Sequence, residues 1–153
     1  MAVNYDALAA QLEALMEGVP YEVANLANAS ALLWQELPEL NWAGFYKMTD
    51  GALVLGPFQG KTACIRIPVG KGVCGTAAES RKTQRVENVH EFPGHIACDC
   101  ASNSEIVVPI FCGERLWGVL DIDSPVFSRF REEDQLGLEH LAAILGKMLE
   151  TAK

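Results

Sequence analysis

Two apolar segments on either side of Gly113-Glu114 constrain the fold of this chain more than any other feature. The segments span residues 105–112 and 115–122, and the short polar pair between them predicts a β-hairpin. Asp50-Gly51 is a second turn signal, which follows an aromatic strand predicted at residues 41–48. Hairpins of this kind, without strand–helix–strand repeats, are typical of an antiparallel sheet.

Helical spacing of apolar residues predicts helices at both ends of the chain. The first forty residues contain two helices, separated by Gly18-Val19-Pro20, and the second helix stops near Pro38. The last helix is predicted from about residue 131 to 151, with an acidic first turn that suits the helix dipole. We therefore expect one α+β domain over residues 1–153, in which an antiparallel sheet is covered by helices.

The middle of the chain is predicted to form shorter elements. Strands are expected at residues 52–55, 63–67 and 84–89, and a short helix at residues 75–80. Residues 90–104 are polar and lack periodicity, which predicts a long loop. Loops of this length in compact domains are often functional.

Charge and composition exclude several classes of protein. The chain of 153 residues has 12 Lys and Arg against 20 Asp and Glu, a net charge of −8. Nucleic acids and anionic membrane surfaces both require a basic footprint, so neither is an expected partner. The sequence also lacks an uncharged apolar segment long enough to span a membrane, and its first residues do not resemble a secretory signal. A cytoplasmic protein is therefore expected.

In a reducing compartment the five cysteines are not expected to form a structural disulfide framework. Cys112 lies in an otherwise apolar strand and is interpreted as a small buried hydrophobic residue. Cys98, in the polar loop, is a better candidate for chemistry. Cys74 is expected in a Gly-rich turn before a short helix, where backbone N–H groups would favour a thiolate. Cys64 falls in the strand predicted at residues 63–67.

Two chemical hypotheses account for the loop cysteines. A zinc site would use His90, His95, Cys98 and Cys100, but their spacing lacks the usual pair of Cys-x-x-Cys motifs. Thiol redox catalysis needs a nucleophilic cysteine such as Cys98 and a resolving thiol within reach, for which Cys64 and Cys74 are candidates. The second hypothesis is favoured.

Three carboxylates are predicted to converge at one end of the 105–122 hairpin. Asp121 and Asp123 share a sheet face by strand alternation, and Glu105 falls opposite them. Such a cluster would suit a ligand that carries an amine, or an acid kept protonated by its neighbours. Simple solvation of strand ends is the alternative. Trp42 and Tyr46 also share a strand face, as part of either the core or a ligand pocket.

Five motifs in the second half of the chain form a recognisable set. They are Gly-Val-Cys-Gly-Thr-Ala (72–77), Val-Glu-Asn-Val-His (86–90), Gly-His-Ile-Ala-Cys-Asp (94–99), Ser-Asn-Ser-Glu-Ile-Val-Val-Pro-Ile (102–110) and Gly-Val-Leu-Asp-Ile-Asp-Ser (118–124). Together they resemble the free methionine-R-sulfoxide reductases, which are single-domain GAF proteins. The resemblance spans nearly the whole chain, from Asn-Trp-Ala-Gly-Phe-Tyr at residues 41–46 to the last helix. A GAF fold places the terminal helices on one side of the sheet and a loop-built pocket on the other.

The resemblance implies a role for individual residues. Cys98 matches the catalytic cysteine, Cys64 the main resolving thiol in a Cys64–Cys98 disulfide, and Cys74 a secondary redox position. The carboxylates that match the substrate pocket are Glu105, Asp121 and Asp123, of which Glu105 and Asp123 are also assigned to catalysis, and the aromatic wall matches Trp42 and Tyr46. Cys100 departs from the small residue expected there, and Cys112 falls outside the family's cysteine set.

The implied reaction is the thiol-dependent reduction of free L-methionine-R-sulfoxide to methionine. It passes through a Cys98 sulfenic acid and an intramolecular disulfide, which a thioredoxin-type reductant regenerates. No metal or organic cofactor is required. A carboxylic acid would supply the proton that the sulfoxide oxygen needs, and the remaining carboxylates would hold the free amino group. A GAF sensory module that binds a ligand without turnover is the competing class, and the terminal helices are candidate surfaces for a homodimer.

Overall fold

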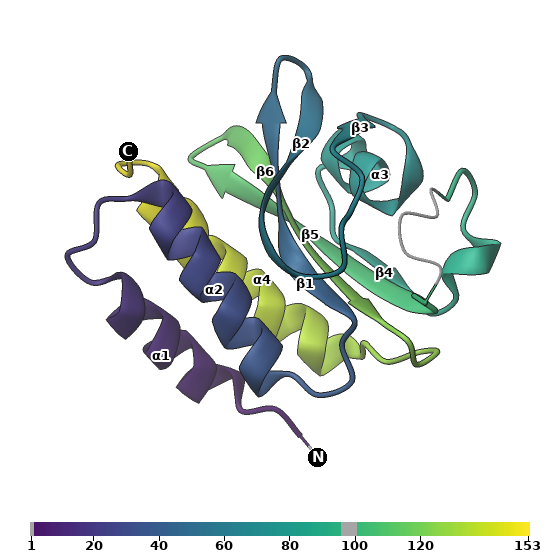
Figure 1. Cartoon of the computed structure of the whole chain (residues 1–153), viewed down its shortest axis with the longest axis horizontal. Helices are drawn as coiled ribbons and strands as arrows, with labels where there is room; N and C mark the ends of the chain where they lie inside the picture. Colours follow the sequence, from purple (N-terminus) through teal and green to yellow (C-terminus); the bar gives the residue numbers. More distant parts are fainter. Residues whose placement is uncertain (1, 96–100) are drawn as a thin grey trace.

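The computed structural model describes residues 2–95 and 101–153, so Cys98 and Cys100 lie outside the described residues. Helices and strands alternate in blocks along this part of the chain (Figure 1). In chain order they are α1 (Tyr5–Met16), α2 (Glu22–Glu36), β1 (Trp42–Thr49), β2 (Ala52–Gly60), β3 (Arg66–Pro68), α3 (Gly72–Ser80), β4 (Gln84–Val86), the 3-10 helix η1 (Val89–Glu91), β5 (Ser104–Cys112), β6 (Arg115–Ser124) and α4 (Glu132–Leu149).

The strands form one antiparallel sheet in the order β3-β2-β1-β6-β5-β4. Both predicted hairpins are confirmed, because β1 pairs with β2 and β5 pairs with β6. At the first turn, Asp50 and Gly51 have φ angles of 51° and 80°, the pair of positive values that a type I′ turn requires. The second turn uses Gly113, with φ of 61°.

Helices α2 and α4 pack on one face of the sheet, and α1 packs against both of them (Figure 1). The apolar stripe of α4 is fully covered, since Leu138, Leu141 and Leu145 are at most 1% exposed. Alternate residues of the central strands, such as Ile106 and Ile122, complete this core. The predicted placement of the terminal helices on one side of an α+β sheet is confirmed.

Helix α3 and the β2–β3 connection cover the opposite face, around a second and smaller core. Val107 and Val119 belong to this core, although their immediate neighbours Ile106 and Leu120 belong to the helical one. The two-residue alternation of the strands therefore sends Glu105, Asp121 and Asp123 to the α3 side.

Several element boundaries differ from the prediction. The strand expected at residues 63–67 is reduced to β3, and Cys64 precedes it, because the Cys64 carbonyl accepts a hydrogen bond from the Tyr46 side chain. Strand β2 is longer than the expected 52–55, since Phe58 to Gly60 still pair with Gly44 to Trp42 of β1.

The segment from α3 to β5 also differs. Helix α3 begins at Gly72 rather than at residue 75, because the Gly75 N–H already donates a helical hydrogen bond to the Lys71 carbonyl. Strand β4 covers only part of the expected 84–89, because the Asn88 side chain accepts from the His90 N–H and starts η1. The predicted loop at 90–104 thus contains the end of this short helix.

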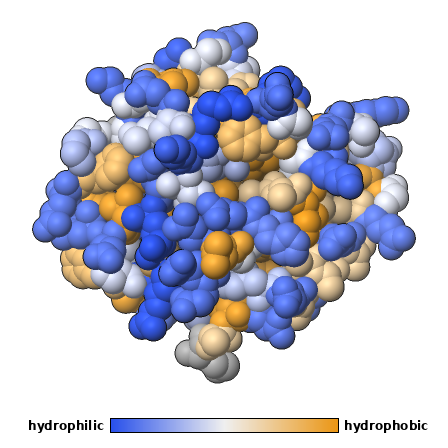
Figure 2. Space-filling view, turned by 180° about the vertical axis from the view of Figure 1, so that it is seen from behind, coloured by the Kyte–Doolittle hydropathy of each residue, from blue (hydrophilic) through white to orange (hydrophobic). Residues whose placement is uncertain are grey.

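None of the helices in the described residues is both long and apolar enough to cross a membrane. The face seen from behind is mainly hydrophilic, with apolar side chains scattered among charged and polar ones (Figure 2).

Candidate active site

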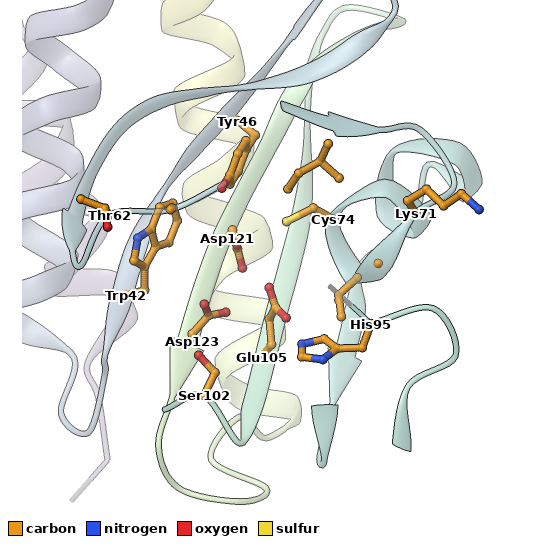
Figure 3. Close-up of a pocket in the computed structure, with 14 residues that line it drawn as sticks. Trp42, Tyr46, Thr62, Lys71, Cys74, His95, Ser102, Glu105, Asp121 and Asp123 are labelled. Atoms are coloured by element: carbon orange, nitrogen blue, oxygen red, sulfur yellow. The ribbon is translucent and has the colours of Figure 1, made fainter. Parts of the chain in front are cut away.

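A pocket lies on the α3 face of the sheet, where strands β1, β6 and β5 meet the β2–β3 connection and α3 (Figure 3). The predicted carboxylates stand at its centre, and Trp42 and Tyr46 form one wall. Cys74 and His95 lie across from this wall. Residues far apart in the sequence thus come together much as the aromatic and acidic motifs predicted.

The carboxylates converge through the strand register. Glu105 of β5 pairs directly with Asp123 of β6, and Asp123 pairs with Trp42 of β1. Asp121 lies two residues before Asp123 on the same face, and Glu105 and Asp121 are only 7% and 6% exposed. Solvation of strand ends is therefore wrong as an explanation for these two carboxylates.

Crowding of these acids changes the protonation of Glu105. Burial raises the pKa of Glu105 well above its ordinary value of 4.5, and the charges of Asp121 and Asp123 raise it further. A protonated Glu105 can donate a hydrogen bond to either aspartate, which also favours the neutral acid. This direction is consistent with the expectation that one carboxylic acid of the cluster is held protonated.

The aromatic wall is a stack of three rings. Trp42 stacks on Tyr46 with 5.8 Å between ring centroids, and on Phe58 with 5.1 Å. The Trp42 indole N–H donates to the Lys61 carbonyl at 3.1 Å, and the Tyr46 hydroxyl donates to the Cys64 carbonyl at 2.9 Å. The wall therefore lines the pocket and also holds the segment that contains Cys64.

Tyr46→Phe is expected to lower stability by about 1 kcal/mol, because the Cys64 carbonyl loses its donor in a part-buried hydrogen bond. Burial and the nearby carboxylates raise the pKa of Tyr46, so its hydroxyl keeps the donating proton throughout the usual pH range. For a domain of this size the loss corresponds to a melting temperature lower by about 2–4 °C. Tyr21→Phe is the matched control, since Tyr21 is 60% exposed. Equal melting temperatures for the two variants would contradict this role of Tyr46.

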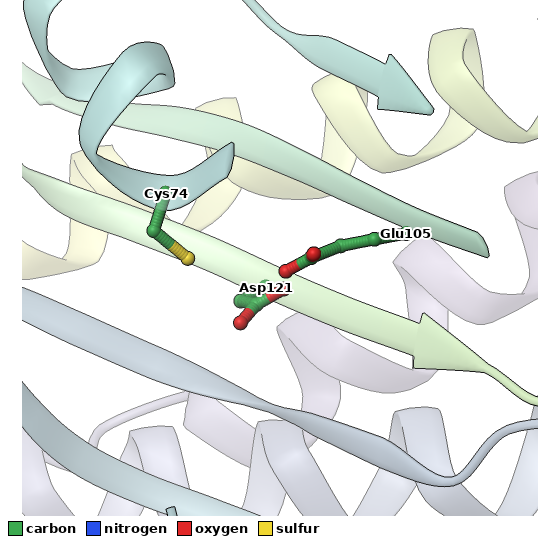
Figure 4. Close-up of side chains that lie close together, drawn as sticks. All are labelled: Cys74, Glu105 and Asp121. Carbon is green, nitrogen blue, oxygen red and sulfur yellow. The ribbon is translucent and has the colours of Figure 1, made fainter. Parts of the chain in front are cut away.

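Cys74 points toward the acids from the first turn of α3 (Figure 4). Its sulfur and one oxygen each of Glu105 and Asp121 lie within 4.8 Å of one another. Burial raises the pKa of the Cys74 thiol well above its ordinary value, and the charges of Asp121 and Glu105 raise it further. The expected thiolate at Cys74 is therefore wrong, because desolvation and neighbouring carboxylates outweigh the helix N-terminus.

The remaining cysteines have different positions. Cys64 does not line the pocket, but its neighbour Ala63 does. Cys64 is disulfide-bonded in this structure, and its partner is not among the described residues. Cys112 is a free, buried thiol on the helical face, as predicted. The predicted nucleophile Cys98 and its neighbour Cys100 lie outside the described residues.

The pocket also contains polar residues that the sequence did not single out for it. Ser102 stands beside Asp123, and Thr62 lies near Trp42 (Figure 3). His95, which the sequence offered only as a zinc ligand, faces Glu105 across the pocket. Burial and the nearby His90 lower the pKa of His95, so its imidazole is neutral at pH 7. The sequence motifs at 94–99 and 102–110 contain His95 and Ser102, but they do not indicate that these side chains point into the pocket.

Cys74, Glu105 and Asp121 are also spaced closely enough to hold a metal ion. A thiol and a carboxylic acid must both lose their protons to bind a metal, and the raised pKa values of Cys74 and Glu105 oppose this. For the zinc site that the sequence offered as the less favoured alternative, the rings of His90 and His95 lie 6.4 Å apart. Its other two ligands are Cys98 and Cys100, which are not described.

Comparison with known proteins agrees with this geometry. Residues 9–149 match the family model described as "GAF domain". The chain is 58% identical over 147 residues to the free methionine-R-sulfoxide reductase of Escherichia coli K12, covering 96% of this chain and 89% of that protein.

Two solved structures are similar throughout. The fRMsr of Staphylococcus aureus in complex with substrate has a TM-score of 0.93 and 50% identity, and 97% of each chain is covered. The free methionine-R-sulfoxide reductase of Neisseria meningitidis in complex with its substrate has a TM-score of 0.94 and 43% identity, covering 99% of this chain and 94% of that chain. This chain therefore belongs to the free methionine-R-sulfoxide reductases, a family built on the GAF fold.

Proposed function

We propose that this protein is an oxidoreductase that reduces free L-methionine-R-sulfoxide to methionine. The observation that carries the proposal is the cluster of the buried Glu105 and Asp121 with the half-buried Asp123, which stands in one pocket with an aromatic wall. Relatives with the same fold carry this activity in their names, and two of them were solved in complex with substrate. The R preference follows from those relatives.

The acids explain why the substrate would be the free amino acid. In the described part of the chain, Asp121 Oδ1 is buried without a hydrogen-bond donor. A buried carboxylate oxygen is stabilised by a cationic donor, and the free ammonium group of the substrate supplies one. In a peptide the same nitrogen is a neutral amide, which leaves the carboxylate charge unpaired. The Trp42 ring offers an apolar face for the sulfoxide methyl group.

Cys98 is the proposed nucleophile. The sulfoxide sulfur is attacked by a thiolate, and the Cys74 thiol is held protonated by burial and by the neighbouring acids. Cys74 is therefore a poor nucleophile in the reduced pocket. It keeps the secondary redox role that the resemblance implies.

Glu105 is the proposed proton donor. The sulfoxide oxygen leaves sulfur only when it is protonated, and the pKa of Glu105 is raised by burial and by the neighbouring aspartates. Asp123, its direct cross-strand neighbour, receives a hydrogen bond from the protonated Glu105 and helps to orient it.

The proposed cycle balances as follows. Oxygen passes from the sulfoxide to Cys98, which releases methionine and leaves a Cys98 sulfenic acid. The Cys64 thiol attacks this sulfur, water leaves, and a Cys64–Cys98 disulfide forms. A thioredoxin-type dithiol then reduces the disulfide by exchange and becomes a disulfide itself. Such reductants belong to reducing compartments, and we place the protein in the cytoplasm.

Three compounds test this function, with dithiothreitol as the reductant. We expect methionine to form from free methionine-R-sulfoxide and not from the S epimer. Acetylation of the amino group of the R epimer is expected to lower kcat/KM by at least about a hundredfold, because the carboxylates lose their cationic partner. The measurement is the reduced product formed over time, which is methionine from the free epimers and N-acetylmethionine from the acetylated compound.

If the folded, reduced protein converts neither free epimer to methionine, the proposal is overturned. That result would favour a GAF module that binds a ligand without chemistry. Equal turnover of the free and the acetylated R epimer would show instead that the carboxylates do not bind the ammonium group.

A further inference from the structure

The segment that contains Cys64 presents an unusual surface beside the pocket. Ile65, its immediate neighbour, is 74% exposed, the largest exposed fraction of any large apolar residue in the described part of the chain. Cys64 itself is partly exposed, and Lys61 and Arg66 are exposed on either side. Single exposed apolar side chains are common on protein surfaces, but this one lies directly beside a disulfide-bonded cysteine.

This exposure is built into the fold. The Leu55 N–H of β2 donates to the Ile65 carbonyl at 2.9 Å. The Tyr46 hydroxyl holds the Cys64 carbonyl, and the Trp42 indole holds the Lys61 carbonyl. Both ends and the centre of the segment are therefore fixed, and with them the outward direction of the Ile65 side chain.

The charge of this segment of the chain is opposite in sign to that of the whole protein. The chain has a net charge of −8, yet residues 51–78 contain Lys61, Arg66 and Lys71 and no acidic residue. Within residues 2–95 and 101–153, neither Lys61 nor Arg66 forms an ion pair. The surface around Cys64 is thus both apolar and basic, a combination that complements an acidic protein with an apolar contact area.

We infer that Lys61, Ile65 and Arg66 form the docking surface for the protein that regenerates the enzyme, an acidic thioredoxin-type dithiol protein. This inference rests on the proposed function. Ile65 would be buried against apolar residues beside the partner's cysteines, and Lys61 and Arg66 would attract its negative charge. A small thiol buries little surface and has no use for these contacts.

The position of this surface also indicates which sulfur of the disulfide the partner attacks. A thiolate of the partner attacks Cys64 Sγ, so the Cys64–Cys98 bond breaks and Cys98 leaves as a thiolate. The partner's second thiolate then attacks the partner sulfur of the mixed disulfide, which releases Cys64 as a thiolate. The partner loses two electrons and two protons, and the two enzyme thiols gain them.

The test compares two reductants on the same variants at saturating free methionine-R-sulfoxide. Ile65→Ser is expected to raise the KM for reduced, negatively charged thioredoxin about tenfold, as for loss of a central apolar contact. Lys61→Glu/Arg66→Glu is expected to raise it about tenfold at low ionic strength and much less at high ionic strength. Turnover driven by dithiothreitol is expected to stay within about twofold for all of them.

Matched controls come from α4, on the opposite face of the sheet, and from the C-terminal residue that follows it. Leu136→Ser removes a leucine that is 61% exposed, and Lys147→Glu/Lys153→Glu makes the same change of charge at two exposed lysines. Neither is expected to change the KM for thioredoxin more than about twofold. Because Ile65 is so exposed, melting temperatures are expected to match those of the unsubstituted protein.

Equal KM values for Ile65→Ser and Leu136→Ser would overturn the docking surface while turnover with dithiothreitol leaves the proposed function standing. An equal rise in the KM for thioredoxin in both double charge variants would mean that only the net charge of the protein matters. That result would overturn the role of Lys61 and Arg66. Absence of turnover with dithiothreitol in the unsubstituted protein would instead remove the proposed function, and this inference with it.

Discussion

Cys98→Ser is expected to lower methionine formation by at least about a thousandfold, because a hydroxyl at neutral pH cannot replace a thiolate as the nucleophile. Among the described residues, Cys74 is the thiol that lines the pocket, and its raised pKa keeps it protonated. Cys112 lies on the other face of the sheet. Neither is therefore able to substitute for Cys98.

Single-turnover experiments without added reductant separate the nucleophile from the resolving thiol. The reduced protein is expected to release methionine in a burst, and Cys98→Ser is expected to release none. Cys64→Ser is expected to keep the burst, because attack on the sulfoxide precedes the resolving step, but to lose steady-state turnover with thioredoxin. Cys112→Ser is the control and is expected to behave like the unsubstituted protein. A burst from Cys98→Ser would refute the assignment of the nucleophile.

Strand periodicity explains why much of the pocket could be predicted from the sequence. In a regular hairpin centred on Gly113-Glu114, Glu105 would lie opposite Ile122, and the register shift between Ile110 and Phe111 places it opposite Asp123 instead. The four-residue spacing of Trp42 and Tyr46 places both rings on one face. Alternation within each strand therefore predicts which side chains share a face, whereas the shift that sets the final pairing is found only in the structure.

The other side of the pocket depends on contacts that no local pattern contains. Cys64 is fixed by Tyr46, 18 residues earlier, and Lys61 by Trp42, 19 residues earlier. These hydrogen bonds draw the chain away from the strand predicted at residues 63–67. The protonation of Cys74 could not be predicted either, because it depends on burial under α3 and on acids from two distant strands. The position of Cys74 at a helix N-terminus, taken alone, would predict a thiolate.

Glu105→Gln is expected to lower kcat by about 10²–10⁴-fold, the usual loss when a general acid is removed. Glutamine keeps the shape of the side chain and can donate to Asp121 and Asp123, but it has no proton to give to the sulfoxide oxygen. Glu13→Gln, at an exposed position of α1, is the matched control and is expected to leave kcat unchanged. Unchanged kcat in Glu105→Gln would mean that another group protonates the oxygen.

Glu105→Gln is also expected to raise the stability of the folded protein, and the pH dependence of stability shows why. Burial and two neighbouring carboxylates raise the pKa of Glu105 in the folded protein above its ordinary value of 4.5. Between these two pKa values the folded state holds a proton that the unfolded state has lost, so stability falls as the pH rises through this interval. Glutamine does not titrate, so Glu105→Gln avoids this loss. The melting temperature of Glu105→Gln should exceed that of the unsubstituted protein, by about 2–4 °C for each kcal/mol gained in the free energy of unfolding, and the difference should grow with pH above about 4.5.

An acid that is kept in place although its replacement stabilises the fold is retained for chemistry. A melting temperature that falls in Glu105→Gln at every pH would show instead that this carboxyl group serves the structure.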